Sequence, residues 1–269
     1  MSKFRGFLVA GASLLATTIA AQSADLYGAH GGRGSIKDDY VQTAPRGCPK
    51  WYARVDGGYT TYDRPAMTQV GIDDLIGARF TDTGSIGGGL GYYFACNIRG
   101  DITVDHRYES DVKGFNGNPF APNYGQMKWG YESTSIMANV YYDFNVGARI
   151  TPYIGFGLGG VHNQFGKGSG TVGAGAREFV NGVQQASGAI GTPTTVGAGS
   201  DWHVAAAAMT GFVFSMTDRL KLDTGYRFMY LGAAKTGQTA NAFGGTGGNI
   251  HVDSMHAHEF RLGLRYDIR

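Results

Sequence analysis

Past residue 20, the sequence lacks the long uncharged apolar run that a membrane-spanning helix requires, which excludes a helical membrane protein. Proline is scarce as well, with 7 residues in a chain of 269. Glycine, in contrast, is abundant at 45 residues, and the chain has 16 tyrosines and 15 phenylalanines. This composition suits strands, turns and loops better than helices. We therefore expect one large all-β domain.

The N-terminus predicts a secretory signal. Lys3 and Arg5 precede an apolar stretch over residues 7–20, and the small residues Ala21 and Ser23 flank Gln22 at a cleavage site. Removing residues 1–23 takes away two positive charges and no negative ones, which leaves 21 basic and 21 acidic residues. The formal charge of +2 then disappears. No cationic excess remains for binding nucleic acid.

The last stretch of the chain alternates strictly between charged and apolar residues. The charges are Glu259, Arg261, Arg265 and Asp267, and the apolar residues are Phe260, Leu262, Leu264, Tyr266 and Ile268. A period of two is typical of a strand with one apolar and one charged face. The same alternation returns along the chain and predicts eight strands, over residues 51–62, 83–94, 98–108, 133–144, 150–164, 202–216, 220–231 and 256–268. Each can cross a bilayer as a tilted strand, which takes about 9–11 residues.

The connections between these strands alternate between short and long. The short ones are 95–97, 145–149 and 217–219, and the long ones are 63–82, 109–132, 165–201 and 232–255. In an eight-stranded antiparallel up-and-down outer-membrane barrel, the short turns face the periplasm and the long loops face outside. Both mature termini are then periplasmic. We expect a Gly-rich periplasmic segment over residues 24–47 and the barrel over residues 48–269.

Fourteen charged residues share the polar faces of these strands. The basic ones are Arg54, Arg99, Arg107, Lys221, Arg227, Arg261 and Arg265, and the acidic ones are Asp56, Asp101, Asp105, Asp143, Asp223, Glu259 and Asp267. A charge facing lipid costs up to about 2–4 kcal/mol at mid-depth. Slipping every strand by one residue would expose all fourteen to lipid, at a cost on the order of tens of kcal/mol. The charges are therefore predicted to line the barrel interior.

A soluble lipocalin-like barrel or sandwich is the alternative, and it would bury the apolar faces and wet the polar ones. The apolar faces of the predicted strands are too extensive for a soluble protein. Aromatic residues near the strand ends match the girdles of a membrane barrel at both interfaces. They are Trp51, Tyr92, Phe94, Tyr142, Phe144, Trp202, Tyr230 and Tyr266. The pattern favours insertion into the outer membrane.

Four stretches of the chain resemble those of a known family. They are WYARVDGGY at 51–59, TPYIGFG at 151–157, TGYRFMYL at 224–231 and EFRLGLRY at 259–266. These resemble small eight-stranded outer-membrane barrels of alphaproteobacteria, related in fold to the OmpA transmembrane domain and OmpX. The resemblance implies a surface protein of the porin or surface-antigen type, tied to envelope integrity. Such barrels usually finish on an aromatic residue, whereas this chain ends on Ile268 and Arg269.

The two cysteines predict a disulfide. Cys48 precedes the first expected strand and Cys96 follows the second, so antiparallel pairing brings both to the periplasmic rim. Secretion places them in an oxidising compartment. The bond would contribute about 4 kcal/mol through loop-closure entropy. Two free thiols are the alternative.

The inner charges admit two interpretations. Eight strands leave an interior just wide enough for side chains, so the balanced charges are expected to form a structural plug that holds the wall together. The protein is then expected to be a non-enzymatic structural barrel that stabilises the envelope and displays its loops. A narrow, low-conductance porin is the alternative. The expected partners are outer-membrane lipid and lipopolysaccharide. Residues 109–132 also offer aromatic residues for a surface ligand, unless these pack onto the barrel mouth; they are Phe115, Phe120, Tyr124, Trp129 and Tyr131.

No cofactor, metal or catalytic residue is predicted. The histidines gather near the outer strand ends at His106, His162, His203, His251, His256 and His258. A metal or phosphate site is conceivable there, but His203 points away from the face that His256 and His258 share. A lipid A-modifying enzyme would have to use one of the latter two. The glycines between 155 and 160 match a dinucleotide fingerprint by letters only, because no helix follows them.

Overall fold

The computed structural model describes residues 50–69, 75–116, 125–144, 149–171, 178–180, 183–185, 191, 193–240 and 246–268. The chain divides into two compact units, Met1–Arg46 and Gly47–Arg269, and every described residue belongs to the second. The described part is all-β. No helix in it is long and apolar enough to cross a membrane.

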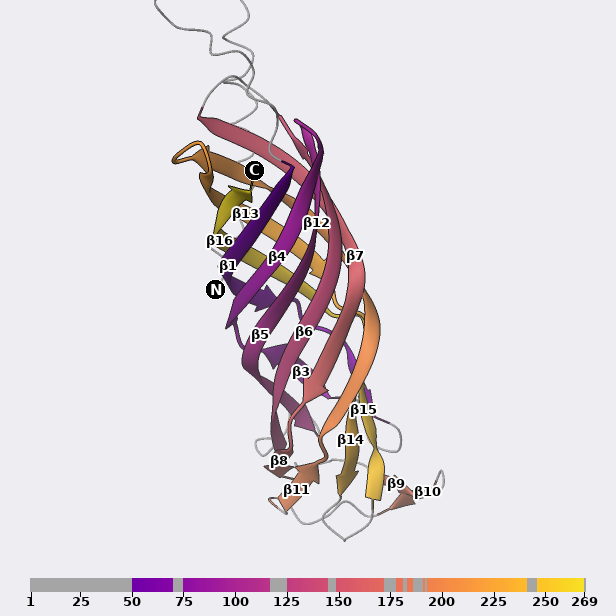
Figure 1. Ribbon diagram of the computed structural model, residues 1–269. Helices are drawn as coiled ribbons and strands as arrows, with labels where there is room; N and C mark the ends of the chain where they lie inside the picture. Colours follow the sequence, from indigo (N-terminus) through magenta and orange to yellow (C-terminus); the bar gives the residue numbers. More distant parts are fainter. Residues whose placement is uncertain are drawn as a thin grey trace, which may run out of the picture. The chain divides into compact units, whose positions relative to one another are not determined.

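Eight long strands form a closed antiparallel ring (Figure 1). They are β1 (Trp51–Tyr62), β4 (Thr83–Ala95), β5 (Ile98–Asn116), β6 (Gly125–Asp143), β7 (Ile150–Phe165), β12 (Gly199–Ser215), β13 (Leu220–Tyr230) and β16 (His256–Ile268). β1 and β16 close the ring, with Trp51 opposite Ile268 and Tyr62 opposite Ala257. The predicted eight-stranded antiparallel barrel is confirmed.

The two ends of the ring differ. At one end, which we call the short-turn end, β4 joins β5 through residues 96–97, and β12 joins β13 through residues 216–219. At the other end, the hairpin end, the long connections form further strands. These are β2 (Met67–Gln69), β3 (Ile76–Phe80), β8 (Gly168–Thr171), β9 (Glu178–Val180), β10 (Val183–Gln185), β11 (Pro193–Val196), β14 (Ala234–Ala240) and β15 (Thr246–Val252).

Most of these short strands form a second tier beyond the hairpin end of the barrel, drawn at the bottom of Figure 1. In hydrogen-bonded order it runs β3, the end of β5, the start of β6, β8, β11, β14, β15 and β2. The Leu75 backbone N–H donates to the Met67 carbonyl oxygen at 3.2 Å, which links β2 and β3 within one connection. β9 and β10 pair only with each other. We call the ring of short strands and strand ends the hairpin tier.

The barrel wall is apolar outside and polar inside. Large side chains on its outer face are widely exposed, as at Leu90 (63%) and Leu262 (58%). The girdle aromatics lie on this outer face too. Trp51, Phe94 and Trp202 are exposed, and the Tyr92 ring lies 5.0 Å from that of Trp51. Inside, charged and hydroxyl side chains are buried. This matches what hydrocarbon outside and a filled lumen inside require.

The hairpin tier inverts that arrangement. Its inward side chains are apolar and buried, including Phe80, Val112 and Trp129. Its outward side chains are mostly polar, such as Lys128, whose side chain is 53% exposed; the half-buried Phe115 is an exception. A surface that is polar outside and apolar inside suits water. The change of polarity along continuous strands therefore marks where the protein leaves the bilayer.

Two expectations about the long connections were wrong. Residues 109–116 and 125–132 are not a loop, because β5 and β6 continue as a paired hairpin out to Asn116 and Gly125. Residues 165–201 also contain strands β8 and β11, which pair with each other. In β8 small residues conceal the period of two. On β5 the apolar residues change face across a register shift between Arg107 and Ser110, so the strand seemed to end there.

Candidate functional site

The structure places all fourteen sequence-predicted charges inside the barrel, and each one pairs with a charge of opposite sign. The pairs join Arg54 to Asp56 and Asp101, Arg99 to Asp143, Arg107 to Glu259, Lys221 to Asp267, Arg227 to Asp105 and Glu259, Arg261 to Asp56 and Asp105, and Arg265 to Asp223. The least buried side chain is Lys221, at 18% exposure. Because isolated buried charges are very costly, this pairing is what permits them to be buried at all.

Near the short-turn end, tyrosines and charges share one layer. Lys221 Nζ lies 2.6 Å from Asp267 Oδ2, and the Tyr93 hydroxyl donates to Asp267 Oδ1 at 3.2 Å. Arg99 Nε donates to both oxygens of Asp143 at 3.1 Å. Its guanidinium carbon lies 3.9 Å from the centre of the Tyr141 ring. Hydrogen bonds surround the Arg99 guanidinium only in part, and the face of the Tyr141 ring adds a stabilising contact to this cation.

In the middle of the barrel, two carboxylates each accept from several strands. Asp101 accepts from the Tyr52 hydroxyl at 2.9 Å and from Asn139 Nδ2 at 2.8 Å. Asp105 accepts from Arg227 Nη1 at 2.9 Å and from Arg261 Nη2 at 2.7 Å. Side chains from β1, β5, β6, β13 and β16 therefore meet across the lumen. The arrangement links opposite walls of the barrel.

Nearest the hairpin end, Glu259 is the centre of the network. It accepts hydrogen bonds from Arg107 Nε at 2.6 Å and from Arg227 Nε at 2.5 Å. Neither Arg107 nor Glu259 has exposed side-chain surface. Arg107 also donates to the Ser135 hydroxyl at 3.2 Å. Bonds to ionised partners are about twice as strong as neutral ones.

Glycines on two strands make space for this network. The inward glycines of β7 face large side chains of β6: a Cβ on Gly155 would lie 2.5 Å from the Tyr141 ring, and one on Gly157 would lie 2.2 Å from Asn139 Oδ1. On β4, Gly91 gives the same room to Tyr52. The glycine run that resembles a dinucleotide fingerprint lies wholly within β7. It serves packing in the wall, as the sequence suggested.

A cavity of about 10 Å³ lies between Arg54, Arg261 and Tyr153 in mid-barrel. That volume holds about one water molecule.

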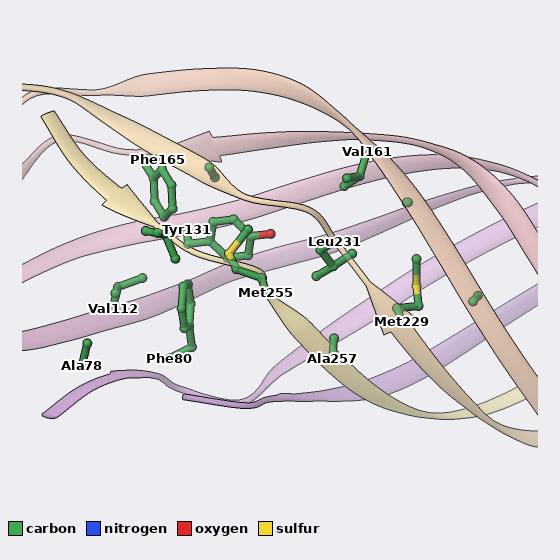
Figure 2. Packing of buried hydrophobic residues seen from close by; sticks show 14 of the residues in the cluster. Ala78, Phe80, Val112, Tyr131, Val161, Phe165, Met229, Leu231, Met255 and Ala257 are labelled. Atoms are coloured by element: carbon green, nitrogen blue, oxygen red, sulfur yellow. The ribbon is translucent and has the colours of Figure 1, made fainter. Parts of the chain in front are cut away.

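The buried apolar cluster runs from the lumen into the hairpin end, and Figure 2 shows some of its members on separate strands. At the hairpin end it is mainly aromatic. The Tyr131 ring lies 5.1 Å from the rings of both Phe80 and Phe165 and 5.8 Å from that of Tyr62. Met255 and Leu231 lie beside them and are fully buried. We call Tyr62, Phe80, Tyr131, Phe165, Leu231 and Met255 the apolar cover.

The inward tyrosines are the network members that sequence reasoning missed. Tyr52 lies two residues from Arg54, and Tyr141 lies two residues from Asp143, so each tyrosine is on the same face of its strand as an inward charge. The alternation could therefore have predicted both. Tyr93 and Tyr153 lie on Gly-rich strands in which the period of two is weak.

Among the described aromatic residues predicted to form a ligand surface, two are buried. Trp129 and Tyr131 are buried within the cover and the tier. Phe115 is half-buried, and Phe120 and Tyr124 lie outside the described residues. The prediction of an aromatic contact surface on residues 109–132 is therefore wrong for Trp129 and Tyr131. Packing onto the barrel mouth, the alternative, is what the structure has.

The histidines do not converge. His258 contacts the Tyr226 hydroxyl through Nδ1 at 2.6 Å, His256 stacks on Phe228, and His162 lies against Trp202. Within the described ranges, no group of three or more His, Cys, Asp or Glu side chains could hold a metal ion. Cys96 is not a free thiol. Its expected partner Cys48 lies outside the described residues, so their pairing stays a prediction.

Comparison with known proteins decides the family. The family model described as "Opacity family porin protein" matches residues 53–268, which is the whole barrel from β1 to β16. The chain belongs to this family. The Opacity family assignment makes the protein a bacterial outer-membrane β-barrel, and it confirms the resemblance that the barrel motifs suggested.

Individual relatives of this Opacity family member are more distant. An uncharacterized protein of Brucella suis is 26% identical over 267 residues, covering 81% of this chain and 85% of the relative. Outer membrane protein PagN of Salmonella typhimurium is 28% identical over 196 residues, covering 68% and 73%. Among solved structures, OprG of Pseudomonas aeruginosa is 14% identical with a TM-score of 0.49, covering 82% of this chain and 99% of OprG. Neisserial surface protein A is 16% identical with a TM-score of 0.43, covering 81% and 97%.

Proposed function

We propose that this protein is a structural, non-enzymatic outer-membrane barrel that reinforces the envelope and presents the hairpin tier at the cell surface. One observation carries the proposal: the lumen holds seven ion-paired cations and seven ion-paired anions beneath an apolar cover. Such an interior ties the wall together, and the cavity that the described side chains leave in mid-barrel measures only about 10 Å³. A transport role would need a continuous aqueous path.

We propose the short-turn end as periplasmic and the hairpin end as external. Two features support this orientation. Outer-membrane barrels carry short turns on the periplasmic side and long connections outside. The hairpin tier, polar on its outer face, suits the aqueous exterior. An even number of strands then places both barrel termini in the periplasm. The predicted disulfide between Cys48 and Cys96 would lie at the periplasmic rim.

A narrow porin is the second candidate, and the family description itself favours it. Conduction would require the apolar cover to move and the ion pairs to rearrange. An enzyme acting on lipid A is the third candidate from the sequence. Within the described residues His258 bonds to Tyr226 and lies 3.4 Å from Asp63, and no serine is bonded to it. A Ser/His pair facing the outer leaflet is what such an enzyme would require.

Deletion of the gene tests the proposal. A structural barrel predicts greater sensitivity to detergents and large antibiotics, because the outer membrane is weakened, while uptake of small sugars stays normal. A porin predicts the reverse: slower uptake of small solutes with an intact barrier. Liposome swelling with the purified protein and small sugars separates the two directly. Swelling well above that of empty liposomes would favour the porin.

A further inference from the structure

The backbone ladder of the barrel wall is interrupted near the hairpin end. The ladder between β12 and β13 stops at the pair of Ala206 and Tyr230. β12 continues to Gly199, paired with β7 on its other side, while residues 231–233 form the turn that leads into β14. We call residues 199–205 of β12 and the facing residues 231–235 the seam. Packing and side-chain contacts close the wall here, where the β12–β13 ladder does not.

His203 of β12 supports the turn at the seam. Gly232 in this turn has a φ of +74°, which residues with a Cβ rarely adopt. It lies so close to β12 that a Cβ added at Gly232 would be 2.6 Å from the Cβ of His203. Register places the fully buried Val161 of β7 opposite His203. The turn therefore rests on the histidine side chain.

The same turn carries part of the apolar cover. The Leu231 N–H donates to the Met255 carbonyl oxygen at 2.8 Å, and the Met255 N–H donates to the Gly232 carbonyl oxygen at 2.8 Å. Asn163 Nδ2 donates to the Leu231 carbonyl oxygen at 3.0 Å, and the Tyr131 hydroxyl donates to Asn163 Oδ1 at 2.8 Å. Figure 2 shows Met255 beside Tyr131. A displacement of the turn would therefore move two members of the cover, Leu231 and Met255.

One nitrogen of His203 has no partner. Its Nε2 is buried and makes no hydrogen bond among the described residues. A neutral imidazole can leave this nitrogen without a proton, whereas a protonated imidazole donates from both nitrogens. A buried donor without an acceptor is costly, and more so when it is charged. The closed seam therefore suits the neutral form of His203, and histidine is the side chain that changes charge between pH 5 and 8.

Asp201 can accept from a protonated His203. The two residues lie two positions apart on β12, so their side chains are on the same face, about 7 Å apart along the strand. In the closed seam, Asp201 Oδ2 lies 3.7 Å from Lys235 Nζ of β14, and both side chains are partly exposed. A protonated His203 would therefore compete with Lys235 for this carboxylate.

The other charged or titratable groups on the surrounding elements do not offer such a partner. They are His162, His251, Asp253, Arg107 and Glu259. His162 lies on the outer face against Trp202, and His251 is exposed opposite Lys235. Asp253 is exposed on the connection before Met255. Arg107 and Glu259 pair with each other in the lumen.

We propose that the seam is an acid-sensitive switch, in which protonated His203 leaves Gly232 and pairs with Asp201. This pairing releases Lys235 from Asp201 and removes the support of the turn at residues 231–233. The bonds between Leu231, Gly232 and Met255 then open, and the apolar cover loosens at low pH. The ion pairs deeper in the lumen stay in place, so opening of the seam predicts no conductance. Failure of this inference is therefore distinct from failure of the structural role.

Hydrogen exchange of the refolded full-length mature protein in detergent micelles tests the switch. The backbone amides of Leu231 and Met255 report on the turn directly, because both donate within it. After correction for the intrinsic exchange rate at each pH, they are expected to exchange about tenfold faster at pH 5 than at pH 7.5. The Asp267 amide donates to the Arg219 carbonyl oxygen at 2.8 Å at the short-turn end. It is the internal reference, and its corrected rate should not change.

Three variants identify the groups responsible. His203→Gln cannot be protonated, so its two amides should exchange at the same corrected rate at both pH values. His162→Gln is the matched control on the outer face and should keep the tenfold change. Lys235→Gln leaves Asp201 free to receive His203, so the acceleration should begin at a higher pH.

If His203→Gln fails to show heat-modifiable gel mobility, the wild-type profile and Lys235→Gln still decide the matter. Four results would each overturn the proposal: no acceleration in the wild type, full acceleration in His203→Gln, loss of the acceleration in His162→Gln, or an unchanged onset in Lys235→Gln.

Discussion

Arg107 Nε donates to Glu259 Oε1 at 2.6 Å across the lumen, joining β5 to β16, which lie three strands apart in the wall. Neither side chain has exposed surface. Glu259 also accepts from Arg227, so a single carboxylate holds two guanidinium groups. The pair connects strands that the backbone ladder does not connect. Loss of this pair should therefore lower the stability of the whole barrel.

Removal of Glu259 is expected to destabilise the folded barrel strongly. Glu259→Ala leaves Arg107 and Arg227 buried without their shared acceptor, and breaking such a pair costs about 3–5 kcal/mol. Urea unfolding in lipid vesicles, followed by heat-modifiable gel mobility, measures the loss. Asp111→Ala is the control, because its pair with Lys128 is exposed and should contribute less than about 1 kcal/mol. Equal losses in both variants would contradict the network.

A charge placed on the lipid-facing wall should impair insertion. Leu262 lies near the middle of β16 and is 58% exposed on the outer face. Leu262→Arg is expected to cost about 2–4 kcal/mol in folding into lipid vesicles. Gln126→Arg, on the outer face of the hairpin tier, should change stability by less than about 0.5 kcal/mol, because that position faces water. A large cost at residue 126 would mean that the boundary is misplaced.

The hairpin tier should depend on its own apolar interior. Trp129 is 2% exposed and packs inside the tier, so Trp129→Ala is expected to cost about 3–5 kcal/mol of local stability. Limited proteolysis should then cut the hairpins while the barrel stays intact. Trp202, 59% exposed on the outer wall, is the comparison: Trp202→Ala should leave the hairpins resistant. Hairpins that stay resistant in both variants would argue against a packed tier.

The cysteine pairing makes a separate prediction. Mass spectrometry of the mature protein without reduction should find Cys48 and Cys96 joined and neither thiol alkylated. The joint variant C48S/C96S should lose about 4 kcal/mol, since the closed loop no longer restricts the unfolded chain. Recovery of both cysteines alkylated without reductant would eliminate the disulfide.

The sequence predicted the membrane-spanning part of the strands well, because one rule governs it. Lipid outside and charge inside enforce a strict period of two, and the predicted bounds of β1 and β16 agree with the structure at every residue. The inward direction of Arg227 and Asp223 follows from the same rule. Where both faces carry small residues, as on β7, the period weakens, and the inward Tyr153 was missed.

The hairpin tier could not be predicted, since the rule reverses there. In the barrel part of β5, the apolar side chains face outward as far as Tyr108. In the tier part of the same strand, the apolar side chain of Val112 faces inward. A shift of register between Arg107 and Ser110 lies where the reversal takes place. A pattern that changes sign across a bulge resembles the end of a strand.

Conductance of the purified, refolded barrel in a planar lipid bilayer tests the central claim most directly. The ion-paired lumen and its apolar cover predict a membrane whose conductance stays at the baseline of protein-free lipid across the voltage range. Folding of the same sample is verified by heat-modifiable mobility, so that an absent current reports a closed barrel. Steady, large unitary conductance from the folded protein would contradict the account.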